Sequence, residues 1–247
     1  MTAFQNYVIV GGVRFPIDCK VRNWESTGLQ FKAGQAANRK RKRDIDLAVI
    51  HWTAGENPAT STYKTLVTRG LGIEFVVDVD GVLWQMADPL EVDTADVGPF
   101  NPRSLGFEVT CYGYRKEGQK APRERAERKE MIHGRPLLVA SFLEAQKETL
   151  AVALKTLHAT GLFRFELVAP AESMVAAYPR LLPARFVRSY QGVVGHFHLS
   201  EEKTDPGLEV FEWMFAKGHL SPVVVEETKS SPASSPSMSR KAKAPHQ

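Results

Sequence analysis

Five residues in three short segments have the side chains of a metal-dependent hydrolytic site. His51 follows the apolar run 45–50, Glu108 lies in a strand-like run, and His196 is followed closely by Lys203 and Asp205. Two neutral imidazoles and one carboxylate can fill three positions around tetrahedral Zn²⁺ and leave the fourth for water, whose pKa the metal lowers to about 7. The second carboxylate and the lysine then suit a proton shuttle and an oxyanion stabiliser. These residue types predict a hydrolase.

Length and composition favour one α/β domain with a substantial core, because the 247 residues are 43% apolar. Cys19 and Cys111 are far apart and form no CxxC pair, which argues against a disulfide framework and a thiolate zinc site. Nowhere do eighteen apolar residues follow one another, and residues 1–10 lack the features of a signal peptide. We therefore expect no transmembrane segment and a chain that is cytoplasmic at synthesis.

The elements that must position these side chains alternate between strands and helices. Asp80-Gly81 favours a tight hairpin turn, Ser141 to Glu144 has the pattern of a capping box, and Pro170 suits a first helical turn. Strands are predicted at 7–10, 45–50, 75–77, 82–84 and 104–112, and helices from Thr60 or Ser61 to about 69, at 143–157, at 170–178 and at 208–216. This order predicts a mixed central β-sheet flanked by helices.

Three regions are expected along the chain. Residues 1–44 would be a strand-rich lead-in, and residues 45–220 a catalytic domain with a charged insertion at 113–136. Residues 221–247 are rich in Ser, Pro and Lys and have almost no apolar content after Val225, so we expect a disordered tail.

Four motifs stand in the order and spacing of a known family. They are 49–54 (VIHWTA), 75–81 (FVVDVDG), 101–108 (NPRSLGFE), and Gly195-His196 with 203–207 (KTDPG). Residues 45–217 thereby resemble the zinc-dependent N-acetylmuramoyl-L-alanine amidases, whose superfamily includes phage lysozyme-like amidases, muropeptide-recycling amidases and peptidoglycan-recognition proteins. The resemblance implies an amidase/peptidoglycan-recognition-like α/β fold, a Zn²⁺ cofactor and a peptidoglycan or muropeptide substrate.

The resemblance also implies a role for each matching residue. His51, His196 and Asp205 would bind zinc, Glu108 would take the proton of the attacking water, and Lys203 would stabilise the oxyanion. The bond cleaved would be the amide between N-acetylmuramic acid and L-alanine. Substrate contacts are predicted for Trp52, Thr53, Glu74, Asp96 and Asn101.

Glu74 and Asp96 are departures from the family pattern. Each stands where many relatives have a histidine, in segments that here are 72–75 (GIEF) and 94–98 (TADVG). Two extra carboxylates near the site could change substrate specificity or weaken catalysis.

Three functional hypotheses remain open at this stage. The favoured one is a phage or prophage endolysin that acts on the cell wall after release. The alternatives are a cytoplasmic muropeptide-recycling amidase and a peptidoglycan-binding protein with weak or no catalysis. The basic runs 39–43 and 115–135 could contact anionic cell-wall polymers. No nucleic-acid-binding motif is present, and we expect a monomer without nucleic-acid partners.

Overall fold

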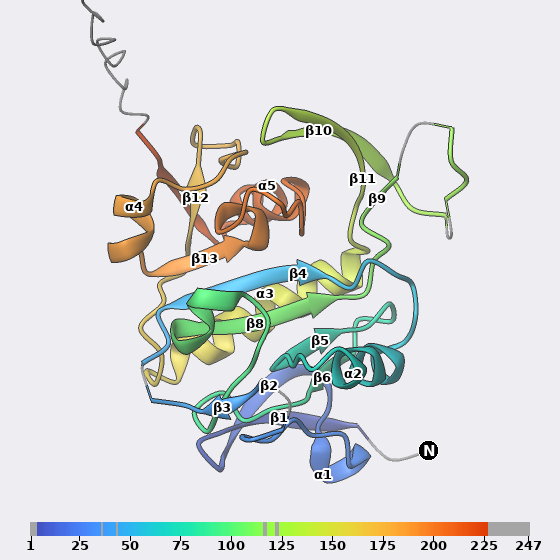
Figure 1. Cartoon of the computed structure of the whole chain (residues 1–247), viewed down its shortest axis with the longest axis vertical. Helices are drawn as coiled ribbons and strands as arrows, with labels where there is room; N and C mark the ends of the chain where they lie inside the picture. Colours follow the sequence, from blue (N-terminus) through green and yellow to red (C-terminus); the bar gives the residue numbers. More distant parts are fainter. Residues whose placement is uncertain (1–3, 36, 43, 116–117, 122–123, 227–247) are drawn as a thin grey trace, which may run out of the picture.

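Strand β4 (Leu47–Trp52) lies inside a mixed seven-stranded sheet and carries His51 near its end. The computed structural model describes residues 4–35, 37–42, 44–115, 118–121 and 124–226. In order across the sheet, the strands are β1 (Gln5–Val10), β2 (Val13–Arg22), β6 (Leu83–Gln85), β5 (Phe75–Val77), β8 (Ser104–Val109), β4 and β13 (Gly192–Gly195). Strands β5, β8, β4 and β13 run parallel, whereas β1–β2 and β5–β6 are antiparallel (Figure 1).

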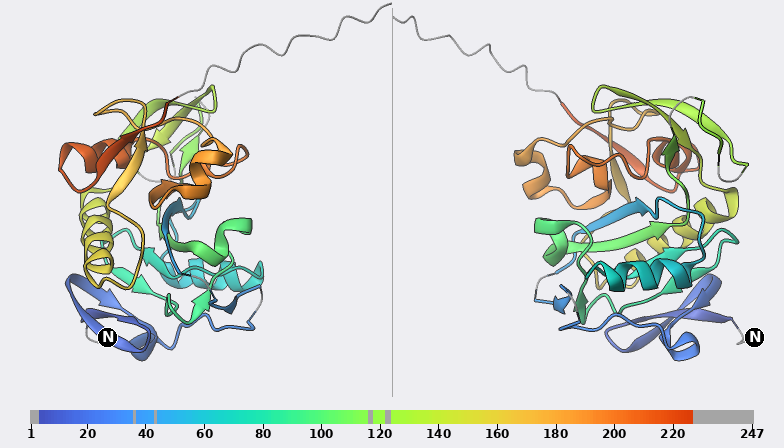
Figure 2. Two further views of the ribbon diagram at one scale, coloured as in Figure 1. Left: turned by 90° about the vertical axis from the view of Figure 1, so that its left-hand side faces the viewer. Right: turned by 45° about the vertical axis from the view of Figure 1, so that its right-hand side comes forward.

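Helices cover both faces of this sheet because its inner strands are apolar on both sides. All six residues of β4 are buried. Helix α3 (Glu144–Ala159) and helix α2 (Ala59–Thr68) lie on opposite faces (Figure 2). The alternation along β5 shows the two faces: Phe75 and Val77 share a core cluster with Leu154 of α3, whereas Val76 packs in another with Leu66 of α2. The mixed sheet flanked by helices is thus confirmed.

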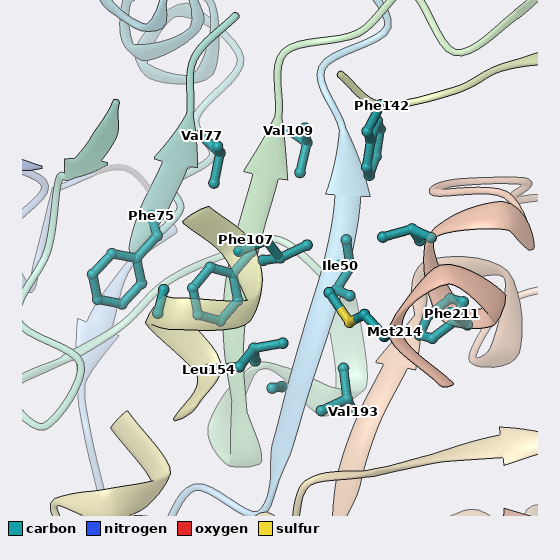
Figure 3. Packing of buried hydrophobic residues seen from close by; sticks show 14 of the residues in the cluster. Ile50, Phe75, Val77, Phe107, Val109, Phe142, Leu154, Val193, Phe211 and Met214 are labelled. Carbon is teal, nitrogen blue, oxygen red and sulfur yellow. The ribbon is translucent and has the colours of Figure 1, made fainter. Parts of the chain in front are cut away.

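The larger core cluster lies between the sheet and α3 (Figure 3). Ile50, Phe107 and Val193 come from three neighbouring strands, and Leu154 packs against them from α3. The rings of Phe75 and Phe107 stack with centroids 5.1 Å apart. This packing fixes β4 and β8, the two strands that carry His51 and Glu108.

The N-terminal hairpin is the edge of the same sheet. Strand β2 pairs in parallel with β6, and the β1–β2 turn is closed by Gly11 and Gly12, both with positive φ. Asp88 accepts the N–H groups of both glycines at 2.8 Å, which ties the hairpin to the rest of the domain. A short helix, α1 (Trp24–Thr27), follows.

The charged insertion is folded. Strands β9 (Tyr114–Arg115), β10 (Glu127–Ile132) and β11 (Arg135–Ala140) form a separate three-stranded sheet, the green hairpin at the top of Figure 1. Two of its arginines form ion pairs with the rest of the domain: Arg125 with Glu56 at 2.6 Å, and Arg128 with Glu212 at 2.6 Å. Residues 116–117 and 122–123 of this predicted insertion lie outside the described residues.

The structure corrects the helix predicted at 170–178. Val168–Ala171 is strand β12, which pairs in parallel with β14 (Ser221–Val224), so Pro170 lies in a two-stranded edge sheet. This pairing also means that the tail predicted to be disordered from residue 221 begins with a strand, and Val225 is buried. The remainder of that prediction, residues 227–247, lies outside the described residues.

The caps of two predicted helices also differ from the sequence pattern. Helix α3 begins at Glu144, where Gln146 accepts the N–H of Leu143 at 3.0 Å, so the predicted Ser141–Glu144 box is not formed. Helix α2 follows Pro58, and Asp78 from beyond β5 accepts the N–H of Ala59 at 3.0 Å. A side chain distant in sequence thus caps α2.

The remaining elements complete the domain. They are β3 (Arg39–Lys40), β7 (Val92–Asp93), the 3₁₀ helices η1 (Gly98–Arg103) and η2 (His196–His198), α4 (Ala184–Ser189) and α5 (Glu209–Ala216). Helix α5 confirms the prediction at 208–216. No helix within the described ranges is long and apolar enough to cross a membrane.

Candidate metal centre and catalytic cleft

Three side chains from distant segments converge at the ends of β4 and β13. His51 lies on β4, His196 begins η2 directly after β13, and Asp205 lies on the following loop. His51 Nδ1 is 3.0 Å from His196 Nδ1, and each of these nitrogens is 3.1 Å from Asp205 Oδ2. All three residues are buried. The predicted ligands thus meet in one cluster.

The geometry and chemistry of this cluster fit a divalent cation. Ligand atoms at about 2.0–2.1 Å from a tetrahedral metal are separated by about 3.3 Å, close to the triangle seen here. Burial alone would raise the pKa of Asp205, but hydrogen bonds to His196 and His51 outweigh it and hold that pKa below its usual range. The Asp205 carboxylate therefore stays ionised between two imidazoles. One carboxylate and two imidazoles form a ligand set that suits Zn²⁺ and similar divalent ions.

A close backbone approach brings the Asp205 loop to His196. A Cβ on Gly195 would lie 2.6 Å from Pro206 Cδ, so any larger residue would push the loop away. The N–H of Phe197 donates to the carbonyl of Asp205 at 3.1 Å, which fixes the loop against η2. Glycine at 195 is therefore required by the position of the third ligand.

Glu108 and Lys203 line the cleft beside the cluster. Glu108 is the direct register partner of His51 across the parallel strands β8 and β4. Its Oε2 is buried without a hydrogen-bond partner in the described structure, and burial raises the pKa of Glu108 to about 8, against the opposing effect of His51. Lys203 is exposed at the rim. A carboxylate and an ammonium group therefore both line the cleft that contains the cluster.

The cleft of about 380 Å³ extends from the cluster along helix α2. Trp52 and Thr53 line it, and their predicted contacts with substrate stay predictions. A polar row on α2, formed by Ser61, Thr65 and Arg69, lines the opposite side. The sequence analysis missed this row, although its i, i+4 spacing marks one face of a helix.

Asp96 also lines the cleft, but its carboxylate turns toward the metal cluster. Asp96 Oδ2 is 3.5 Å from His51 Nε2, and the Asp96 side chain is 6% exposed. Asp96 therefore lies between the cleft and His51, and its predicted contact with substrate stays a prediction.

Glu74 and Asn101 lie outside the cleft, which corrects their prediction as substrate-binding residues. Glu74 is fully buried, accepts a hydrogen bond from Arg41 Nη2 at 2.9 Å and accepts the N–H of Gly106 at 2.9 Å. Asn101 uses its side-chain oxygen to accept the N–H groups of Asp96 and Val97. The Glu74 carboxylate and the Asn101 side-chain oxygen are thus held by partners within the protein.

Two further residues have roles that the sequence did not indicate. Arg41, from the basic run 39–43, is buried against Glu74, whereas Arg39, Lys40 and Lys42 are exposed and Arg43 lies outside the described residues. His198, two positions after His196, donates from Nε2 to the carbonyl of Tyr178 at 2.8 Å and accepts the N–H of Gly195 at Nδ1 at 3.0 Å, and it is not among the clustered residues of the described structure.

A mixed sheet with a buried His-His-Asp cluster, a neighbouring carboxylate and an open cleft is an arrangement suited to a hydrolase that uses a metal ion. Residues 41–208 match the model of the Amidase_2 family, N-acetylmuramoyl-L-alanine amidase. Because the match spans more than half of the 247 residues, the chain belongs to this family of enzymes. Peptidoglycan or a muropeptide is accordingly the class of substrate that the family implies.

Solved structures with related architecture include two endolysins and one further amidase. The Clostridium intestinale endolysin LysCS is 14% identical, with a TM-score of 0.45, and the match covers 72% of this chain and 85% of that one. The Ph2119 endolysin from a Thermus scotoductus bacteriophage is 19% identical, with a TM-score of 0.43, and the match covers 81% and 98%. The E. coli amidase AmiD is 19% identical, with a TM-score of 0.46, and the match covers 87% and 66%. A comparison with curated proteins gives no match.

Proposed function

We propose that this chain is a zinc-dependent amidase that hydrolyses the bond between N-acetylmuramic acid and L-alanine in peptidoglycan. The observation that carries the proposal is the triangle of His51 Nδ1, His196 Nδ1 and Asp205 Oδ2, with Glu108 in register beside it. Two imidazoles and one carboxylate with an open fourth position are the ligand set of a catalytic zinc site. Zn²⁺ would supply a Lewis acid that polarises the scissile carbonyl and lowers the pKa of water.

The surrounding residues supply the proton transfers and the charge stabilisation. Glu108 has an unpartnered, buried Oε2 that can take the proton of the attacking water and return it to the leaving L-alanine nitrogen. Lys203 at the cleft rim carries the positive charge that stabilises the developing oxyanion. Trp52, Thr53 and the polar row on α2 form the walls that orient the substrate.

We further propose that the substrate is polymeric, as for a phage or prophage endolysin. A second hollow of about 450 Å³ shares Ala54 with the cleft and is lined by Tyr112 and Tyr114 with polar neighbours of the insertion. Such a continuation suits a substrate that extends well beyond the scissile bond. The protein would be made in the cytoplasm and reach the wall after release. A muropeptide-recycling amidase is the second candidate, because the cleft alone can accommodate a small muropeptide.

The test is the release of new L-alanine amino termini by the zinc-loaded protein. Purified sacculi and soluble anhydro-muropeptides would be compared as substrates, with His196→Ala as the inactive variant. His158→Ala is the matched control, because that histidine lies far from the cluster and pairs with Glu166. We expect release from sacculi by the unaltered chain and by His158→Ala only. A strong preference for soluble muropeptides would favour the recycling enzyme, and binding without cleavage would favour a recognition protein.

A further inference from the structure

Asp96 is a buried carboxylate without a hydrogen-bond partner. Neither of its carboxylate oxygens has a partner among the described residues, although its side chain is only 6% exposed. A buried charge without compensation is strongly unfavourable, so such a group persists only where something nearby requires it. The polar atom that lies near this carboxylate is His51 Nε2, 3.5 Å from Asp96 Oδ2.

The facing atom of His51 is the counterpart of this carboxylate. His51 Nδ1 points to His196 and Asp205, which makes it the nitrogen available to a metal. A neutral imidazole that offers Nδ1 as a lone pair carries its proton on Nε2. His51 Nε2 is itself buried and unpartnered in the described structure. The donor, His51 Nε2–H, and the acceptor, Asp96 Oδ2, thus both lack a partner among the described residues. They face each other at the longest distance that a hydrogen bond spans.

The neighbouring structure is built to hold Asp96 in this place. Asn101 accepts the N–H groups of Asp96 at 3.2 Å and of Val97 at 2.7 Å, which fixes the backbone of the loop. Gly106 lies under the carboxylate, and a Cβ at this position would clash with Asp96 Oδ2 and Ile73. The Gly106 N–H is in turn held by Glu74.

The buried Arg41–Glu74 pair also contacts the loop that follows Asp96. Arg41 donates to Glu74 Oε1 at 2.9 Å and to the carbonyls of Asn101 and Pro102 at 3.3 Å. Two residues that the sequence placed at the substrate, Glu74 and Asn101, thus support the position of Asp96. Glu74 and Asn101 therefore share a structural role.

We propose that Asp96 is a positioning residue for the metal centre: it accepts the Nε2 proton of His51 and thereby fixes the tautomer and ring orientation that present Nδ1 to the metal. This inference rests on the proposed zinc site. Carboxylate partners of metal-binding histidines raise ligand basicity, and their loss lowers metal affinity by about 10- to 100-fold. Asp96 does not touch the scissile bond in this role.

The test is the zinc dissociation constant, measured by competition with a chromophoric chelator. We expect Asp96→Asn and Asp96→Ala to bind zinc about 10- to 100-fold more weakly than the unaltered chain. Asp93→Asn is the matched control, because Asp93 is a buried aspartate three residues away that does not line the cleft. Circular dichroism and urea unfolding would confirm that each protein is folded. Unchanged zinc affinity in folded Asp96 variants would overturn the proposal.

A second measurement uses the unaltered chain, so it does not depend on variant folding. In zinc-loaded protein labelled with ¹⁵N-histidine, the His51 Nε2–H proton should resonate downfield and exchange slowly with water. Rapid exchange of that proton would contradict a hydrogen bond to Asp96. If the unaltered chain fails to bind zinc at all, the proposed function fails. If it binds zinc but the Asp96 variants bind equally well, only the inference about Asp96 fails.

Discussion

His51 and Glu108 are direct register partners on the neighbouring parallel strands β4 and β8. Side chains opposite each other on adjacent strands point to the same face of a sheet. The strand pairing itself therefore places a residue of the candidate metal site beside a carboxylate whose buried Oε2 has no partner among the described residues. The relationship depends on the core that holds the two strands rather than on a flexible loop.

Replacing Glu108 by Gln should separate metal binding from turnover. The amide keeps the shape of the side chain but cannot accept the proton, so we expect kcat to fall by about 10² to 10⁴. Zinc content, measured by atomic emission, should remain at the level of the unaltered chain because Glu108 is not among the clustered ligands. A variant with normal turnover would remove Glu108 from the role of general base.

Removing zinc should abolish activity and lower stability together. A metal that binds only the folded chain stabilises it by about 4 kcal/mol when free zinc is 1,000 times the dissociation constant. Thermal unfolding with and without a chelator measures this shift. Added Ca²⁺ or Mg²⁺ should not restore activity, because these hard cations prefer oxygen ligands over the two imidazoles. Full activity in thoroughly chelated protein would contradict the zinc assignment.

Glu130 should be important for the loop that carries Asp205. From strand β10, it accepts the N–H of Leu208 at 2.7 Å and of Glu209 at 3.0 Å, at the start of helix α5. Glu130→Ala would leave two N–H groups without partners, and we expect a loss of about 3 kcal/mol in the free energy of unfolding. Urea denaturation would measure it. Glu201→Ala, at an exposed position, should change stability by less than about 0.5 kcal/mol.

The sequence predicted the parts of the site that lie on regular strands. The apolar run 45–50 before His51 predicted a strand, and the structure confirms it as the fully buried strand β4. Periodicity and turn chemistry are local properties, so they identify such segments without knowledge of the fold.

Partners distant in sequence could not be predicted in this way. Arg41 belonged to a basic run that was expected to contact anionic cell-wall polymers, yet tertiary packing buries it against Glu74. Pro170 suited a helix start, but the distant strand β14 recruits its segment into a sheet. In both cases a contact between residues far apart in the chain overrides the local pattern.

The stability of the chain should carry a pH dependence from Glu74. Burial raises the pKa of Glu74, an effect that Arg41 only partly offsets, so the folded chain holds this proton more tightly than the unfolded chain. Below the unfolded pKa, near 4.5, both states are protonated and the group has no effect. As the pH rises above that value, the unfolded state loses its proton first, and Glu74 makes folding progressively less favourable until its folded pKa is passed. Glu74→Gln lacks this titration. The free energy of unfolding of the unaltered chain minus that of Glu74→Gln should therefore decrease between pH 4.5 and neutrality. Urea titrations across this range measure the difference, and a difference that increases with pH would show that the Arg41 pair dominates over burial.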